Sequence, residues 1–169
     1  MTHSELLKVI YRFYPRGLQD YDPSYDATEE RRHLADAAIR ARIEYTTWER
    51  VIHPLGARYS LQNESLHLLA GGLDPAYSAR IYLPRETISF HVSFLGPYYG
   101  VHHLGESDEA PAAIARQIEA VYPGHAPIPP DLGDEVIPDL GLGSMPFGTS
   151  TIYLFLLSRV WEWGGVREP

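Results

Sequence analysis

His91 is the residue whose type and neighbours first suggest chemistry in this chain. It lies in the segment TISFHVSF at positions 87–94, where polar and apolar residues alternate, and Ser89 and Ser93 lie on either side of it. A catalytic histidine needs a nucleophile and an orienting carboxylate nearby, and no spacing in the sequence indicates either. The sequence therefore predicts a structural or solvent-exposed histidine.

The same polar residues also suggest a binding surface. Arg80 and Tyr82 belong to the preceding predicted strand, so a sheet would bring them close to His91 on one polar face. Such a face would bind a small ligand if it formed an enclosed pocket. A ligand-binding or regulatory domain that uses Arg80, Tyr82 and His91 is therefore one alternative. A hydrolase is a second alternative, and it would need His91 or His103 near a carboxylate with a perturbed pKa.

Metal and phosphate sites are not indicated. His102 and His103 are adjacent, so in a strand their side chains point to opposite faces and do not share one ion. The glycines of residues 141–148 follow no predicted strand, and no Lys-Ser or Lys-Thr pair comes after them. The chain has no cysteine, which excludes disulfides and Cys-based zinc sites. We expect no metal and no cofactor.

Charge is distributed unevenly along the chain. The formal net charge is -8, but residues 1–99 hold 12 acidic and 11 basic side chains, whereas residues 100–169 hold 10 acidic and 3 basic. A one-signed field repels nucleic acid and attracts a basic partner. We therefore predict no direct nucleic-acid binding. A solubility role alone is the simpler interpretation of the same excess.

The acidic residues include a group in a proline- and glycine-rich segment, residues 123–148, which contains six Pro, five Gly and no Lys or Arg. An irregular segment of this length is usually functional or disordered, but its apolar residues indicate that it is pinned to the core. Carboxylates on a rigid loop lose little entropy when they meet cations, and tryptophans are frequent interface anchors. The predicted partner-binding residues are Asp131, Asp134, Glu135, Asp139, Trp161 and Trp163.

The elements that would position these residues begin with two helices. A capping box at residues 2–5 starts a helix that we expect to reach about Tyr14. A second helix, capped by Asp26 or Thr28, is expected to continue to Leu55, because its apolar residues are separated by four and three residues in turn. Charged residues interrupt the first predicted helix, so we expect it not to be a signal peptide.

The rest of the chain predicts a sheet and a third helix. Short connections make the central strands antiparallel, and the segment TSTIYLFLLS is apolar on both faces, as in a buried central strand. A helix capped by Asp108 is expected near 109–122. Strands are expected at 66–69, 77–83, 87–95, 98–103 and 149–158.

The predicted fold class is α+β in one domain spanning residues 1–169. An antiparallel sheet of about four to six strands packs against a long N-terminal helical region and the shorter helix near 109–122. The longest apolar run, residues 152–157, is too short to span a membrane, which needs about 20 residues as a helix. We expect no membrane span and a cytoplasmic location.

Four motifs, in this order, resemble the immunity proteins encoded beside bacterial polymorphic toxins. They are YRFYPRGL, the Thr-Glu-Glu start of the Trp-bearing helix, SFLGPYYGVHH and TSTIYLFLLSRVW. The resemblance covers most of the chain as a pattern. It implies a small protein without catalytic residues that binds and neutralises a cognate toxin domain, and it transfers no individual contact residue.

The charge distribution adds a hypothesis about how such a protein would act. A toxin that acts on nucleic acid, such as a nuclease, presents a basic active-site groove. An acidic inhibitor would be steered to that groove and would exclude the polyanionic substrate.

Overall fold

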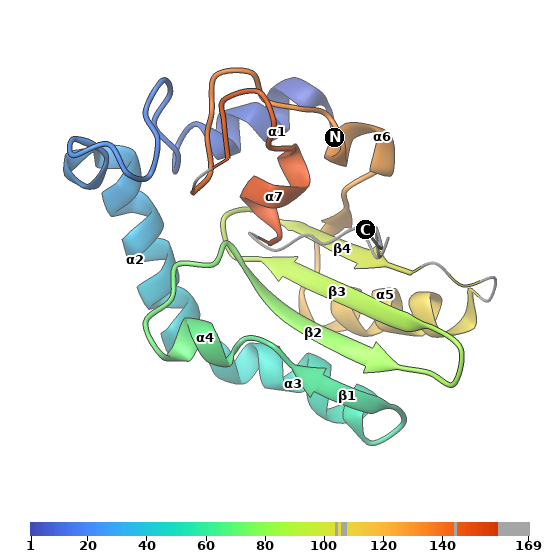
Figure 1. Ribbon diagram of the computed structural model, residues 1–169. Helices are drawn as coiled ribbons and strands as arrows, with labels where there is room; N and C mark the ends of the chain where they lie inside the picture. Colours follow the sequence, from blue (N-terminus) through green and yellow to red (C-terminus); the bar gives the residue numbers. More distant parts are fainter. Residues whose placement is uncertain (104, 106–107, 144, 159–169) are drawn as a thin grey trace, which may run out of the picture.

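The computed structural model describes residues 1–103, 105, 108–143 and 145–158, and in them a five-stranded sheet has helices on both faces (Figure 1). The predicted α+β class is confirmed. The sheet order follows the chain. The strands are β1 (Ser60–Asn63), β2 (Ala76–Tyr82), β3 (Thr87–Ser93), β4 (Tyr98–His102) and β5 (Ala126–Pro127).

The sheet is mostly antiparallel, as expected for strands joined by short connections. The pairs β1–β2, β2–β3 and β3–β4 are antiparallel, and β2 and β3 pair over seven residues, from Ala76 opposite Ser93 to Tyr82 opposite Thr87. The short strand β5 adds a parallel edge to β4. This parallel pair was not predicted, because β5 has only two residues and lies at the start of the Pro/Gly-rich segment.

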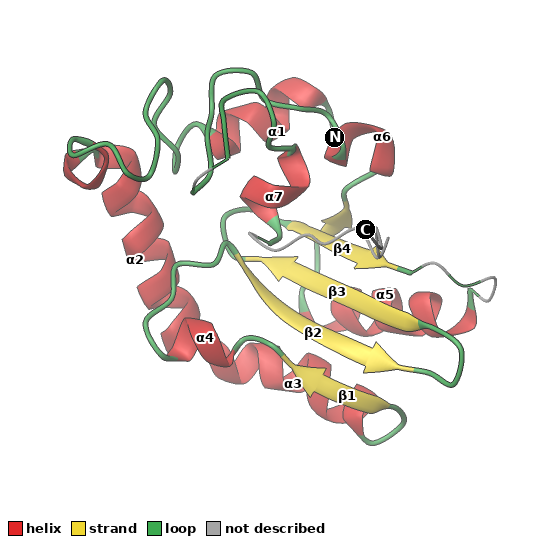
Figure 2. Ribbon diagram, in the orientation of Figure 1, coloured by secondary structure: helices red, strands yellow, loops and turns green. Residues whose placement is uncertain are grey.

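The apolar face of the sheet packs on helices α2 (Glu29–Ile43), α3 (Tyr45–Gly56) and α5 (Glu109–Val121). In Figure 2, α3 and α5 lie behind the sheet and α2 lies at its left. Trp48 on α3 is fully buried and stacks on Tyr77 of β2, with ring centroids 5.5 Å apart. Side chains at every second position of β2 and β3 belong to the same core as Trp48. This alternation is the one that the sequence of β3 predicted.

A second core covers one end of the opposite face. It is built from α1 (His3–Ile10), the short helix α7 (Ile152–Leu156) and the irregular segment before α7. The neighbours Tyr98 and Tyr99 on β4 belong to the two different cores, which shows that both faces of this strand are covered. The expectation that the Pro/Gly-rich segment is pinned is confirmed, since several of its apolar side chains are buried: Ile128, Ile137, Leu140 and Leu142.

The prediction of one long second helix is wrong, because the structure has two consecutive helices there. α2 ends and α3 begins at Glu44, whose backbone (φ -88°, ψ 10°) is outside the helical region. The apolar stripe continues across the break, so periodicity alone did not reveal it. Of the two predicted capping residues, Thr28 caps α2 by accepting a hydrogen bond from the Arg31 amide.

The ends of two other helices also differ from the prediction. The capping box at Thr2 and Glu5 is present, but α1 ends at Ile10 and continues to Tyr14 only as hydrogen-bonded turns. Asp108 lies at the N-cap of α5 without a side-chain capping bond.

Two predicted strands are helices. Residues 66–69 form α4 (Leu66–Leu69), and the edge strand of the sheet is β1, just before it. The segment 149–158 contains α7, whose five residues are all buried. An apolar run that is buried on every side has the same pattern as a strand or as a helix, which explains the error at α7. The remaining elements are a 3-10 turn, η1 (Tyr25–Ala27), and α6 (Pro130–Gly133).

Membrane-crossing helices are absent from the part of the chain that the structure describes. None of its helices has the length and apolar character that a bilayer requires. The longest of them, α2, has 15 residues and carries charge along its length.

The packing of α7 gives a stability prediction. Phe155 is fully buried and contacts Tyr14 edge-on, with ring centroids 4.9 Å apart. We expect Phe155→Ala to lower the free energy of unfolding by about 3–5 kcal/mol, because it leaves a cavity in the second core. Phe147 is 41% exposed, so Phe147→Ala should cost within about 0.5 kcal/mol. Urea denaturation measures both, and equal effects would contradict the burial of α7.

Candidate functional site

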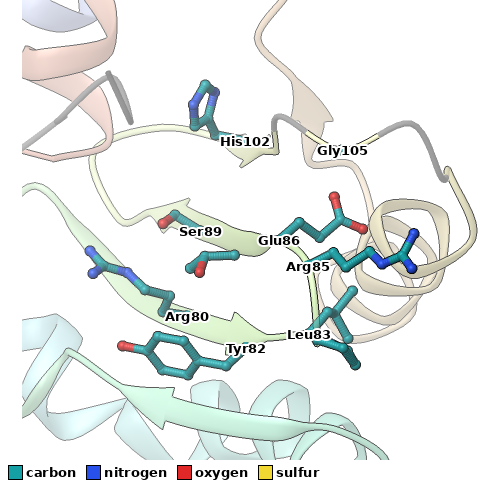
Figure 3. Close-up of a pocket in the computed structure, with 10 residues that line it drawn as sticks. Arg80, Tyr82, Leu83, Arg85, Glu86, Ser89, His102 and Gly105 are labelled. Atoms are coloured by element: carbon teal, nitrogen blue, oxygen red, sulfur yellow. The ribbon is translucent and has the colours of Figure 1, made fainter. Parts of the chain in front are cut away.

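A hollow of about 640 Å³ lies on the polar face of the sheet, beside the turn that joins β2 to β3 (Figure 3). The strand register builds it, since Arg80 lies opposite Ser89 and Ser89 lies opposite His102. These polar side chains therefore cross the sheet in one row, and Tyr82 follows two residues further along β2. The volume is in the range of small-molecule sites, about 300–1,000 Å³.

The charged groups of this hollow do not converge on one point. The side chains of Arg80 and Arg85 point to opposite ends of it (Figure 3). Arg80 Nη2 lies 3.3 Å from Glu64 Oε1, and the carboxylate of Glu86 fills the space beside Gly105. A small anion is held strongly when several donors meet it together. The hollow is therefore a polar concave surface whose donors do not converge to bind one small anion.

His91 is placed beside this hollow but does not line it. Its side chain is buried, and Nδ1 lies 2.8 Å from Ser78 Oγ on β2. Burial, with smaller effects of Arg80 and His102, lowers the pKa of His91 to about 3. The ring is therefore neutral near pH 7. Of the two roles expected for this histidine, the structural one fits a buried, hydrogen-bonded ring.

Ser78 is the residue that sequence reasoning missed. It lies opposite His91 in the β2–β3 register, and counting back from the tight turn would have placed it there. A serine beside a histidine is one requirement of nucleophilic catalysis. A base with a pKa near 3 takes up a proton poorly at neutral pH, so this pair does not form an effective nucleophile and general base.

The Pro/Gly-rich segment of residues 123–148 carries the four predicted carboxylates and is called the acidic segment below. It packs on the side of the sheet that α1 and α7 cover, with α6 beside α1 in Figure 1. Asp131 on α6 is exposed, and among the described residues no basic side chain pairs with it. Asp134 is half-buried, and burial raises its pKa while nearby His102 opposes that shift. Asp131 is therefore more accessible to a partner than Asp134.

The other two carboxylates of the segment contact the N-terminal region. Asp139 forms an ion pair with Arg16 and accepts a hydrogen bond of 2.9 Å from the Tyr11 hydroxyl. Burial raises the pKa of Asp139, but these hydrogen bonds outweigh it, so the net shift is downward. Glu135 Oε2 lies 3.0 Å from His3 Nδ1. The negative charge of Asp139 is therefore largely neutralised by contacts within the chain.

The remaining predicted anchors, Trp161 and Trp163, lie outside the described residues. Among the residues that are described, no group of three or more His, Asp or Glu side chains is arranged to hold a metal ion. Of the predicted site residues, the structure brings Arg80 and Tyr82 together at the hollow and places His91 next to them, under the surface.

Comparisons with known proteins identify no relative of this chain. No protein-family model matches the chain, and no curated protein and no solved structure matches it.

The buried His91 ring predicts a pH effect on stability. The folded pKa is about 3 and the ordinary value is 6.5, so the unfolded state binds the proton more readily as pH falls below about 6.5. The stability of the wild type relative to His91→Gln should fall by up to about 1.4 kcal/mol per pH unit between pH 6.5 and 4, and should be constant above pH 7. Urea denaturation from pH 4 to 8 tests this. A difference that does not change with pH would contradict a buried neutral ring.

Proposed function

We propose that this chain is an immunity protein that binds a cognate bacterial toxin domain and neutralises it without catalysis. The observation that carries the proposal is the charge segregation, with 10 acidic and 3 basic side chains in residues 100–169. The resemblance to immunity proteins supports it. A surface of this sign favours a basic partner and speeds its association.

The acidic segment is the proposed contact surface. Its buried apolar residues hold the backbone in place, so its carboxylates are presented on a rigid support. Asp131 supplies an exposed charge, and Asp134 lies one turn further along. Glu135 and Asp139 complete the proposed surface, although Asp139 is partly neutralised by Arg16. Trp161 and Trp163 remain proposed anchors.

Growth rescue tests the proposal as a whole. The gene next to this one, if it encodes a secreted protein with a toxin-like C-terminal domain, provides the candidate toxin. We expect expression of that domain to stop growth, and co-expression of this chain to restore it through direct binding. A matched control expresses an unrelated acidic protein of similar size. Failure to rescue, with both proteins expressed and folded, would contradict the immunity function.

The two kinds of carboxylate in the segment give a sharper test of the contact surface. Asp131→Asn should slow association with the toxin domain severalfold at low salt and have little effect on stability, because an exposed charge steers encounter. Asp139→Asn should instead lower the melting temperature, because it removes the negative charge that pairs with Arg16 and leaves only one acceptor oxygen for Arg16 and Tyr11. Stopped-flow association at two salt concentrations separates the effects. An unchanged association rate in Asp131→Asn would remove this residue from the surface.

The hollow on the sheet favours a second candidate function, binding of a small polar ligand. Its volume of about 640 Å³ and the presence of Arg80 and Tyr82 in its lining are the observations in its favour. Genomic context distinguishes the two functions. An upstream toxin-like gene supports immunity, and a metabolic operon supports a ligand.

A further inference from the structure

A second pocket lies on the apolar-core side of the sheet, where β2, the end of β3, the end of α5 and the α2–α3 junction meet. It has a volume of about 280 Å³, and its wall includes the rings of Tyr77, Phe94, Tyr122 and His125. The ring centroids of Tyr77 and Phe94 are 5.7 Å apart, and those of Tyr122 and His125 are 5.0 Å apart. The pocket is thus lined by aromatic side chains, and one face of the Tyr77 ring is covered by Trp48.

A carboxylate lies at this pocket. Glu44, the residue at which α2 gives way to α3, is exposed and belongs to the pocket lining. Burial raises the pKa of Tyr77 and of Tyr122, and the negative charge of Glu44 raises both further. The carboxylate is therefore close to both phenol groups. The helix break thus places an exposed carboxylate in the lining of this pocket.

Two buried polar atoms at the pocket lack hydrogen-bond partners within the described residues. They are Tyr122 Oη and His125 Nδ1. Burial lowers the pKa of His125 and outweighs a hydrogen bond to the Ser93 backbone that raises it, so the ring is mostly neutral near pH 7 and one of its nitrogens is an acceptor. A buried polar atom without a partner costs stability and calls for an explanation. Both atoms are enclosed by protein in the free chain, so a ligand that donates hydrogen bonds would satisfy them when the two side chains turn toward the pocket.

We propose that this pocket binds an organic ammonium group, such as a lysine side chain. Aromatic faces attract cations, and the carboxylate of Glu44 supplies the opposite charge. An ammonium group has three donors, which match the two unsatisfied acceptors and the carboxylate. The assignment of the lysine to a bound toxin rests on the proposed function. The ammonium site itself does not.

One basic side chain lies close to the site and opposes binding. Arg50 is exposed, does not line the pocket and lowers the pKa of Tyr122, so its charge acts on the same region. Removal of that charge by Arg50→Gln should strengthen ammonium binding. Glu49 on the same helix also lies outside the lining. Glu49→Gln is therefore the matched control for loss of an acidic charge on this helix.

Titration of the full chain with small probes, followed by NMR, tests the site without any toxin. Nα-acetyl-lysine methylamide should shift the resonances of the pocket residues and saturate, and the uncharged norleucine analogue should not. Glu44→Gln should weaken lysine binding about tenfold, the loss expected for a charge-assisted hydrogen bond. Glu49→Gln should leave binding unchanged. n-Butylammonium shows whether the natural ligand is a protein lysine or a free amine. Weaker binding of n-butylammonium than of the lysine probe favours a protein lysine, and equal binding favours a free amine.

Tyr122→Phe keeps the ring and guards against a result that reflects misfolding. It should bind the lysine probe about three- to tenfold more weakly and melt no lower than the wild type, since the hydroxyl that it removes has no partner in the described structure. The proposal is overturned if the norleucine analogue binds equally well, if the lysine probe does not bind, or if Glu44→Gln and Glu49→Gln have the same effect. None of these results would affect growth rescue, so the immunity function is tested separately.

Discussion

The seven residue pairs between β2 and β3 determine which side chains reach each face of the sheet. Ile81 and Ile88 face the helices α3 and α5, whereas Arg80 and Ser89 face the opposite side. Because strand side chains alternate, a shift of one residue would exchange the two sets and place charged groups in the core. The buried aromatic core and the polar hollow therefore depend on the same register.

The second face is closed only at one end, and this partial cover explains where the acidic segment lies. α1 and α7 pack over the end of β4 near Tyr98, and the Tyr14 hydroxyl bonds the Phe155 carbonyl across this core. The segment between α5 and α7 must cross the same core, which buries its apolar residues. Pairing of Asp139 with Arg16 then ties it to the N-terminal region. Such ties give rigidity but reduce the charge that is left for a partner.

Local patterns in the sequence predicted much of the fold. Strict alternation identified β3, the short connections gave the antiparallel pairing, and capping residues marked the starts of α1 and α2. α7 was misassigned because a fully buried apolar run has no periodicity that separates helix from strand. The break at Glu44 was missed because the apolar stripe continues across it.

The candidate sites were less predictable, because they depend on contacts between distant segments. Arg80 and Tyr82 could be placed on one face from strand alternation. The Asp139 pair with Arg16 joins residues more than 120 positions apart, so no local pattern reveals it. The same holds for the aromatic pocket, whose wall combines the ends of several elements.

The central claim is that residues 130–139 form a fixed acidic surface on which a toxin domain docks. Hydrogen exchange of the free chain and of its complex with the candidate toxin tests it most directly. The account predicts slowed exchange at the hydrogen-bonded amides Gly133, Asp134 and Ile137 in the free chain, and further slowing across this segment in the complex. Free-chain exchange at the rate of an unstructured peptide, or a footprint confined to another surface, would contradict it.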